Sequence, residues 1–192
     1  MLYHVRLMRP GDVDEVTGID REAFPTMKPP TNFQRELGYP LAHYIVACNK
    51  DRANDLIGAE VAGSGKPHIV GFAGIWLMAD EAHIVNIAVR QESRRQGVGE
   101  LLLISLIELA IEINASLITL EVRASDDAAR CLYGKYGFTV RGVRRGYYSD
   151  NREDAVIMTV DNINSALFRA CLGRLKKAHS EKWGTSLCQI VH

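Results

Sequence analysis

Apolar positions along the chain repeat with two periods, one typical of strands and the other of helices. Residues 3–7 alternate between apolar and polar side chains as in a half-buried strand, and the Pro10-Gly11 pair marks the end of that strand. Asp12 can cap a helix, and residues 13–23 carry apolar side chains at helical spacing. The chain is therefore predicted to begin with a strand and a helix.

The same two periods continue to residue 160 without an internal repeat. Further strands are expected at residues 44–48, 68–78, 82–89, 117–123, 138–143 and 155–160, and further helices at 31–37, 100–114 and 126–136. The polar, turn-rich residues 49–67 predict a long surface excursion between two strands. The order β-α-α-β-β-β-α-β-α-β-β predicts an α/β fold, a mixed sheet with one strand–helix–strand crossover in its middle.

Residues 162–177 predict one more helix, which is amphipathic. One stripe carries the apolar residues Leu167, Phe168, Cys171, Leu172 and Leu175, and basic residues lie elsewhere. The favoured interpretation is a helix that packs on the body of the same chain. The alternatives are a homodimer contact, a helix that docks on the ribosome or another partner, and a weak membrane-surface helix.

Composition narrows the class of protein. The 192 residues are 47% hydrophobic, and 23 basic residues balance 23 acidic ones, so no overall field attracts nucleic acid. Four cysteines, at 48, 131, 171 and 188, lack metal-ligand spacing. No signal pattern is present, and no apolar run reaches the roughly 18 residues of a membrane span. We therefore expect a cytoplasmic protein, a monomer or weak homodimer, with free thiols and without metal, nucleic-acid partner or stable membrane insertion.

The most informative segment is Arg94-Arg95-Gln96-Gly97-Val98-Gly99, between an apolar strand and an apolar helix. Glycine tolerates positive φ and lets a backbone amide approach a ligand closely. At a helix start, the free amides carry about half a positive charge and can cradle a phosphate, with arginines adding charge-assisted bonds. A basic turn before a helix is the alternative. Neither a P-loop nor the G-x-G-x-x-G dinucleotide pattern is present.

Several ordered motifs accompany this segment. Arg-x-x-Gly-x-Gly after such a strand resembles the acyl-CoA signature of the GNAT superfamily of N-acetyltransferases. The resemblance extends over residues 120–126, 132–138, 144–148 and 153–158. Together these segments resemble the family of bacterial ribosomal-protein-alanine N-acetyltransferases (RimI), with kinship to archaeal and eukaryotic protein N-terminal acetyltransferases. The match covers about residues 3–160.

The resemblance implies a GNAT acetyltransferase domain at residues 1–160 and a C-terminal amphipathic helical extension at 161–192. The domain would hold a mixed central sheet of about six to seven strands with a splayed parallel pair, flanked by about four helices. Acetyl-CoA would be the acetyl donor, its pantetheine arm lying along the first crossover strand like an added strand.

The resemblance also assigns residues to the coenzyme. The backbone of Ile87, Ala88 and Val89 would hold the thioester end and polarise the acetyl carbonyl as it becomes an oxyanion. The turn and helix start would bind the coenzyme through Arg94, Arg95, Gln96, Gly97, Val98, Gly99 and Glu100. Asp126 stands where the family usually has Asn, and its carboxylate would oppose nearby phosphates. A role as a helix-start acid is therefore the alternative for Asp126.

Two residues match the catalytic positions of the family. Thr119, Glu121 and Arg123 share one face of the strand at 117–123, and Glu121 matches the general base that takes a proton, directly or through water, from the incoming ammonium. Tyr133 lies beside the apolar stripe of its helix and matches the acid that protonates the departing thiolate. Unaided by the resemblance, both would be interpreted as ordinary surface or packing residues.

The acceptor side matches less closely. Tyr147 and Tyr148 match a Tyr pair that walls the peptide groove of related enzymes against the first helix–helix loop, where Phe24 lies; packing on that loop is the alternative. Residues 24–33 lack the Pro-Trp-Ser common in RimI proteins. His83 flanks the expected acetyl site as a reserve base or a satisfied core histidine. Cys131 has no partnered histidine, which argues against an acyl-enzyme.

The sequence therefore predicts direct acetyl transfer from acetyl-CoA to the N-terminal α-amino group of a protein, a ribosomal protein being one candidate. An α-amine has a reference pKa of about 7.7–8.0 against about 10.4 for lysine, so one carboxylate base suffices. The alternatives are a GNAT enzyme for a lysine side chain or a small amine, and a non-catalytic acyl-CoA-binding module.

Overall fold

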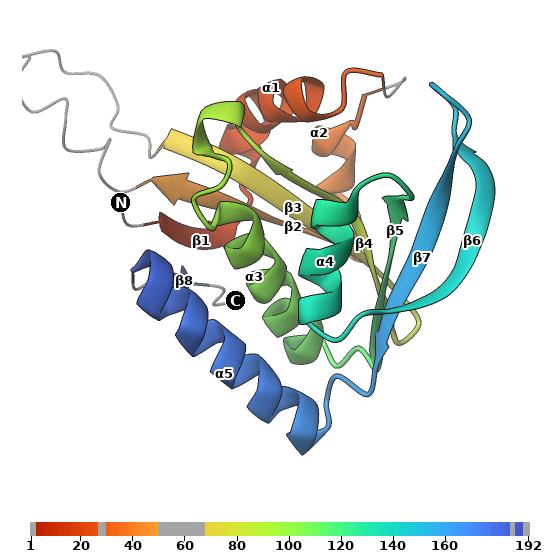
Figure 1. Ribbon diagram of the computed structural model, residues 1–192. Helices are drawn as coiled ribbons and strands as arrows, with labels where there is room; N and C mark the ends of the chain where they lie inside the picture. The colour runs from red at the N-terminus through yellow and green to blue at the C-terminus, as the bar shows by residue number, and fades with distance from the viewer. Residues whose placement is uncertain (1–2, 27–29, 50–67, 185–186, 190–192) are drawn as a thin grey trace, which may run out of the picture.

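The computed structural model describes residues 3–26, 30–49, 68–184 and 187–189 as a single mixed sheet with helices on both faces (Figure 1). The strands are β1 (Tyr3–Leu7), β2 (Ala42–Asn49), β3 (His68–Met78), β4 (Glu81–Val89), β5 (Leu117–Arg123), β6 (Thr139–Tyr148), β7 (Glu153–Asp161) and β8 (Leu187–Gln189). The helices are α1 (Val13–Ala23), α2 (Phe33–Glu36), α3 (Val98–Glu112), α4 (Asp127–Lys135) and α5 (Ala166–Trp183), with 3-10 turns η1 (Pro10–Asp12) and η3 (Gln91–Ser93). The expected excursion at 49–67 lies, apart from Asn49, outside the described residues.

The strand order is β6-β7-β5-β4-β3-β2-β1-β8, and the expected α/β fold is confirmed. The central crossover β4-α3-β5 makes β4 and β5 parallel, and their pairing runs only from Glu81 opposite Leu117 to Ile84 opposite Leu120. At the same level the pairing of β4 with β3 shifts register, which leaves Val85 without a partner on β3. Such a bulge bends its strand. The predicted splay between β4 and β5 therefore begins directly after Ile84.

Two cores lie on opposite faces of the sheet. One is built around α3, whose Leu102, Leu103, Leu106 and Ile107 are inaccessible to solvent. The other lies beneath α1 and α2 and includes Phe33 and Phe72, which meet edge to face. Because α3 is apolar around most of its circumference, it needs cover on both sides. The sheet supplies one side and α5 the other (Figure 1).

The C-terminal segment differs from the expectation in its bounds and in its apolar stripe. The Ser165 hydroxyl accepts a hydrogen bond from the Phe168 amide, so α5 begins at 166 rather than 162, and it continues to 183. Leu167 and Cys171, expected on the buried stripe, are exposed, because the face that meets the body holds Phe168, Leu172, Leu175 and His179. The strand β8, which pairs parallel with β1, was not predicted.

The hairpin after α4 is also longer than expected. β6 extends to Tyr148 instead of residue 143, and β7 begins at Glu153 instead of residue 155. Two register shifts interrupt their pairing, one between Val140 and Gly142 and one between Arg144 and Tyr148, and Gly146 within the second shift has φ of +58°. Most of the segment predicted as a polar loop therefore belongs to the two strands, and only residues 149–152 form the turn.

The depth of the core predicts a large cost for losing one α3 side chain. Leu102 is 0% exposed, so Leu102→Ala should lower the free energy of unfolding by about 2–5 kcal/mol through lost contacts and a residual cavity. Leu167→Ala removes the same atoms from a side chain that is 80% exposed, and it should change stability by less than about 0.5 kcal/mol. Urea unfolding of both variants tests this, and equal losses would contradict the described packing.

Candidate active site

The glycine turn between η3 and α3 has the geometry of an anion cradle. Gly97 is the N-cap of α3 with φ of +80°, and Arg95 two residues earlier also has positive φ, at +61°. The Gly97 carbonyl accepts the Leu101 amide at 2.9 Å, which is the first hydrogen bond of the helix. The amides of the first turn, Val98 to Glu100, have no acceptor within the helix, and they carry the positive end of a 15-residue helix dipole.

Of the side chains in this turn, the two arginines are exposed and the glutamine is bonded within the protein. Arg94 and Arg95 are exposed, and the Arg94 Nε donates to the Val89 carbonyl at 3.1 Å. Gln96 is held from both ends: its Oε1 accepts the Tyr3 hydroxyl at 2.6 Å and its Nε2 donates to the Glu92 carbonyl at 2.8 Å. Gln96 thus ties the turn to β1 and to η3, while the guanidinium groups of Arg94 and Arg95 stay exposed.

Glu100 faces α4 instead of the turn. Its Oε1 accepts Lys135 Nζ at 2.5 Å and the Tyr136 hydroxyl at 2.8 Å. Partial burial opposes ionisation, but these two hydrogen bonds outweigh it and lower the pKa of Glu100. The carboxylate therefore joins α3 to α4, and any contribution of Glu100 to a ligand rests with its backbone amide.

Beyond the bulge, β4 has one paired side and one open side. Ile87, Ala88 and Val89 lie opposite Ala73, Phe72 and Gly71 of β3, whereas the described pairing with β5 stops at Ile84. An extended ligand with amide groups can add to such an open side as a further strand would.

Glu121 lies on β5 one residue past Leu120, the last residue of β5 that pairs with β4. Two basic side chains hold its carboxylate. Ile118, Leu120 and Val122 are buried, as the alternation predicted, so Glu121 lies on the other face with its side chain 9% exposed. Its Oε2 lies 2.6 Å from His83 Nε2 of β4, and its Oε1 lies 3.1 Å from Arg144 Nε of β6. His83 is therefore satisfied by a carboxylate partner, and its role as a reserve base stays a prediction.

Tyr133 lies on α4 and is partly buried. Burial, with smaller contributions from Asp126 and Tyr148, raises the pKa of Tyr133 to about 12. Burial likewise raises the pKa of Tyr148 to about 12, and the Glu121 carboxylate adds a smaller contribution in the same direction. The ring of Tyr133 rests against Phe138.

Asp126 takes the role of helix-start acid. It is the N-cap of α4, and its Oδ1 accepts the Ala129 amide at 2.9 Å. This carboxylate therefore positions the helix that carries Tyr133. A direct contact of Asp126 with a coenzyme stays a prediction.

A network that the sequence did not predict joins the loop after α1, the end of β5 and the β6–β7 hairpin. Asp150, in the turn between β6 and β7, accepts the Thr26 hydroxyl at 2.8 Å and Arg123 Nη2 at 2.8 Å. Arg123 lies two residues after Glu121 on the same face of β5, and the Tyr148 ring lies 3.9 Å from the centre of its guanidinium group. The loop after α1 and the β6–β7 hairpin are thereby joined across the end of β5.

The three residues proposed from the sequence for the acceptor lie around this network. Tyr147 and Tyr148 meet edge to face at 5.3 Å, and Tyr147 is half exposed. Phe24 follows α1 directly and packs, partly buried, against the core beneath α1 and α2. Alternation along β5 was the available signal for Arg123, but nothing in the sequence pattern indicated that Asp150 would accept hydrogen bonds from both Arg123 and Thr26.

The described residues carry free thiols but no cluster of metal ligands. Cys48, Cys131 and Cys171 are free thiols. Within residues 3–26, 30–49, 68–184 and 187–189, no three His, Cys, Asp or Glu side chains gather as metal ligands. Among the described helices, none is both long enough and apolar enough to cross a membrane.

Known proteins share this architecture and sequence. The sequence profile of the Acetyltransferase (GNAT) family matches residues 13–138. A Bacillus subtilis protein named "Putative ribosomal protein bS18-alanine N-acetyltransferase" is 40% identical over 157 residues, which cover 81% of this chain and 93% of that protein. The crystal structure of the ribosomal-protein-S18-alanine N-acetyltransferase from Escherichia coli aligns with a TM-score of 0.66 and 27% identity over 83% of this chain and 94% of that one.

A more distant structure shares the fold. Arabidopsis thaliana NAA60, solved in complex with acetyl-CoA, aligns with a TM-score of 0.68 over 85% of this chain and 99% of its own, at 17% identity. The fold and the sequence profile together define the class, an acetyltransferase built on the crossover with the splayed strands. The chain belongs to the GNAT family, and it resembles the RimI enzymes within that family.

The carboxylate of Glu153 fixes the end of β5 and should titrate far from its usual range. Hydrogen bonds from the side chain and amide of Ser125, with smaller contributions from Asn151 and Arg123, lower its pKa to about 2. The folded-state value lies below the unfolded one, so the resulting stability is present above about pH 4.5 and is lost as the pH falls through 2. Carbon-13 NMR titration should show the Glu153 carboxyl with a midpoint near 2, and Ser125→Ala should raise that midpoint. A midpoint near 4.5 in the unaltered protein would contradict the described contacts.

Proposed function

We propose that this protein transfers the acetyl group of acetyl-CoA to the N-terminal α-amino group of a protein, by direct attack of the amine on the thioester. The observation that carries the proposal is Glu121, a nearly buried carboxylate at the edge of the splay, directly beside the open side of β4. A purely acyl-CoA-binding module needs the splay and the turn but has no use for a carboxylate there.

The donor side is supported by the open strand and the glycine turn. The backbone of Ile87, Ala88 and Val89 would pair with the pantetheine amides and stabilise negative charge on the acetyl oxygen. The first-turn amides of α3, together with Arg94 and Arg95, would hold the diphosphate. Acetyl-CoA supplies the activated acyl group, and the protein residues supply orientation and charge stabilisation.

The acceptor chemistry favours an α-amine over a lysine side chain. Their reference pKa values differ by about 2.5 units, so an α-amine needs about 3.4 kcal/mol less to lose its proton at a given pH. A single carboxylate base is then sufficient. The acceptor proposed from the names of the relatives is the N-terminal alanine of ribosomal protein bS18.

Glu121 and Tyr133 would divide the proton transfers. Glu121 takes one proton from the α-ammonium, directly or through water, and the neutral nitrogen attacks the acetyl carbon. The carbon–sulfur bond breaks as the carbon–nitrogen bond is completed, and Tyr133 donates its phenolic proton toward the thiolate. The second proton lost by the nitrogen restores the phenol. Because burial raises the pKa of Tyr133 to about 12, the phenol stays protonated throughout the neutral range.

His83 and Arg144 would position the carboxylate. His83 Nε2 holds one oxygen of Glu121 and Arg144 Nε holds the other, so the carboxylate has a fixed orientation before the acceptor arrives. Arg144 is half exposed, and the acceptor ammonium competes with it for the oxygen Oε1. His83, on the more enclosed side, would remain bound and orient the base.

Single substitutions should separate the two catalytic roles from binding. Glu121→Gln and Tyr133→Phe should each lower kcat by about 100-fold or more, because each removes a proton transfer. The dissociation constant of CoA should change by less than about twofold in both variants, since neither side chain is assigned to coenzyme binding. The measurements are steady-state kinetics of peptide acetylation and calorimetry with CoA.

Matched controls are available on the surface. Glu81→Gln on β4 and Tyr39→Phe in the loop before β2 make the same chemical changes at exposed positions. Both controls should retain the activity of the unaltered protein. Full activity in Glu121→Gln and Tyr133→Phe would show that the roles are wrongly assigned.

A panel of acceptors tests the substrate class. Mass spectrometry should find acetylation of a peptide with the bS18 N-terminus at its α-amine, with much slower reaction of the same peptide when its α-amine is blocked and only lysine remains. Peptides that differ at the first two residues define the preference. Exclusive modification of lysine or of a polyamine would replace the proposed substrate, and CoA binding without turnover of any acceptor would favour a binding module.

A further inference from the structure

The C-terminal helix α5 runs alongside α3, from the C-terminal end of α3 to the glycine turn at its N-terminal end (Figure 1). Just before α5, Asn164 Nδ2 donates to the Ala115 carbonyl at 2.7 Å, beyond the C-terminal end of α3. At the other end, His179 and Trp183 contact Gly97, the N-cap of α3. The matched family profile ends at residue 138, so these contacts come from a part of the chain that the profile does not include.

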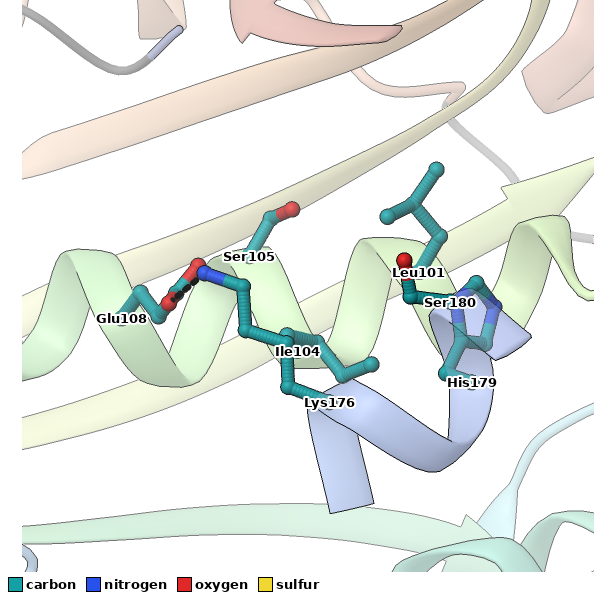
Figure 2. Close-up of a pocket in the computed structure, with 7 residues that line it drawn as sticks. All are labelled: Leu101, Ile104, Ser105, Glu108, Lys176, His179 and Ser180. Atoms are coloured by element: carbon teal, nitrogen blue, oxygen red, sulfur yellow. Dashed lines mark hydrogen bonds and ion pairs between the residues drawn. The ribbon is translucent and has the colours of Figure 1, made fainter. Parts of the chain in front are cut away.

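The two helices pack against each other around one small cavity. Figure 2 shows the residues that line it, which are Leu101, Ile104, Ser105 and Glu108 of α3 and Lys176, His179 and Ser180 of α5, with an ion pair between Lys176 and Glu108. Ser105 is completely buried there, although the α3 sequence places it among the polar residues of that helix. Helix α5 is therefore docked on α3 and is not a projecting appendage.

His179 forms the first contact with the turn. Its side chain is buried, at 5% exposure of the residue, and its Nε2 lies 2.9 Å from the Gly97 carbonyl oxygen. A carbonyl can only accept, so Nε2 carries the proton in this hydrogen bond. The same oxygen accepts the Leu101 amide at 2.9 Å. Two donors from different helices thus fix the direction of one carbonyl.

Fixing that carbonyl also fixes the amide of Val98, one of those proposed to hold the diphosphate. The Gly97 carbonyl and the Val98 N–H belong to one planar trans peptide unit, in which the two groups point in opposite directions. Val98 is the first residue of α3, and its amide is among those without an acceptor in the helix. A hydrogen bond from His179 to the carbonyl therefore limits rotation of the peptide unit that presents this amide.

Trp183 forms the second contact. A Cβ atom placed on Gly97 would lie only 2.7 Å from Cγ and Cδ1 of the indole ring, so the ring rests directly on the glycine Cα. Position 97 is thereby restricted to glycine twice, by its φ of +80° and by this ring. The indole therefore blocks movement of the turn toward α5.

We propose that His179 and Trp183 are positioning residues for coenzyme A, through which helix α5 forms part of the coenzyme site. They hold the Gly97–Val98 peptide in the orientation that binds the diphosphate, and they do not touch the reacting atoms. This inference rests on the proposed function, because it assumes that the diphosphate binds at the glycine turn.

Two acetyl donors distinguish positioning of the turn from general support of the fold. S-acetylpantetheine carries the same thioester as acetyl-CoA but has no diphosphate. His179→Ala should lower kcat/KM for acetyl-CoA by about fivefold to tenfold, the effect of one lost hydrogen bond, mainly through KM. With S-acetylpantetheine, kcat/KM should change by less than about twofold. Calorimetry should show CoA binding weakened by the same factor as the acetyl-CoA KM.

Further variants keep the test decisive. His179→Gln can still donate to the Gly97 carbonyl and should recover most of the affinity for CoA. Trp183→Leu, which leaves His179 in place, should weaken CoA in the same direction. Lys176→Ala is the control: it removes an α5 ion pair that does not touch the turn, so CoA binding should stay unchanged.

The outcomes separate this inference from the function on which it rests. Equal losses with both donors would mean that α5 supports only the fold, and unchanged CoA binding in His179→Ala and Trp183→Leu would mean that the turn holds its own shape. Either result overturns the inference and leaves the proposed function standing. Absence of CoA binding in the unaltered protein would overturn both.

Discussion

The parting of β4 and β5 is the physical constraint on which the other features depend. Parallel strands that pair along their whole length leave no free backbone groups between them. Here the unpaired Val85 bends β4 where the pairing with β5 ends, so the amides beyond it and the side chains on the neighbouring end of β5 face one shared space. The fold thus creates a binding edge inside the sheet, where solvent-exposed edges are otherwise a hazard.

The constraint also explains why the polar residues of the site come from distant segments. A gap within a sheet exposes groups that must find partners or water. Glu121 lies at the edge of the gap, and its two oxygens are matched by His83 from the strand on one side and Arg144 from the hairpin on the other. The loop after α1 and the β6–β7 turn meet through Asp150 at the far end of β5. The site therefore consists of side-chain contacts that span the gap between β4 and β5 and the end of β5.

Much of the fold was accessible from the sequence because its strongest signals are local. The alternation along residues 117–123 located β5 and the face of Glu121, and the apolar circumference of residues 100–114 identified α3 as a buried helix to within two residues at each end. The family motifs then supplied the splay, which no local pattern encodes. The ends of α5 and β6 were misjudged because a capping Ser165 and two register shifts decided them.

The sequence did not predict the side-chain contacts between residues that are distant along the chain. The sequence named Glu121 and noted His83, but a distance between two strands depends on their register, which is fixed by the whole sheet. The partners of Arg123 and the approach of His179 to Gly97 depend on where loops and the last helix settle. Such contacts have no period and no short-range motif, so they became visible only in three dimensions.

The strand order carries a practical consequence. The strands β1 and β8, nearest the two chain termini, lie side by side at one margin of the sheet, whereas β6 forms the opposite margin (Figure 1). An affinity handle or a surface tether attached at either terminus would therefore be joined to the margin away from the β6–β7 hairpin, and immobilised protein would keep the hairpin side turned toward the solution.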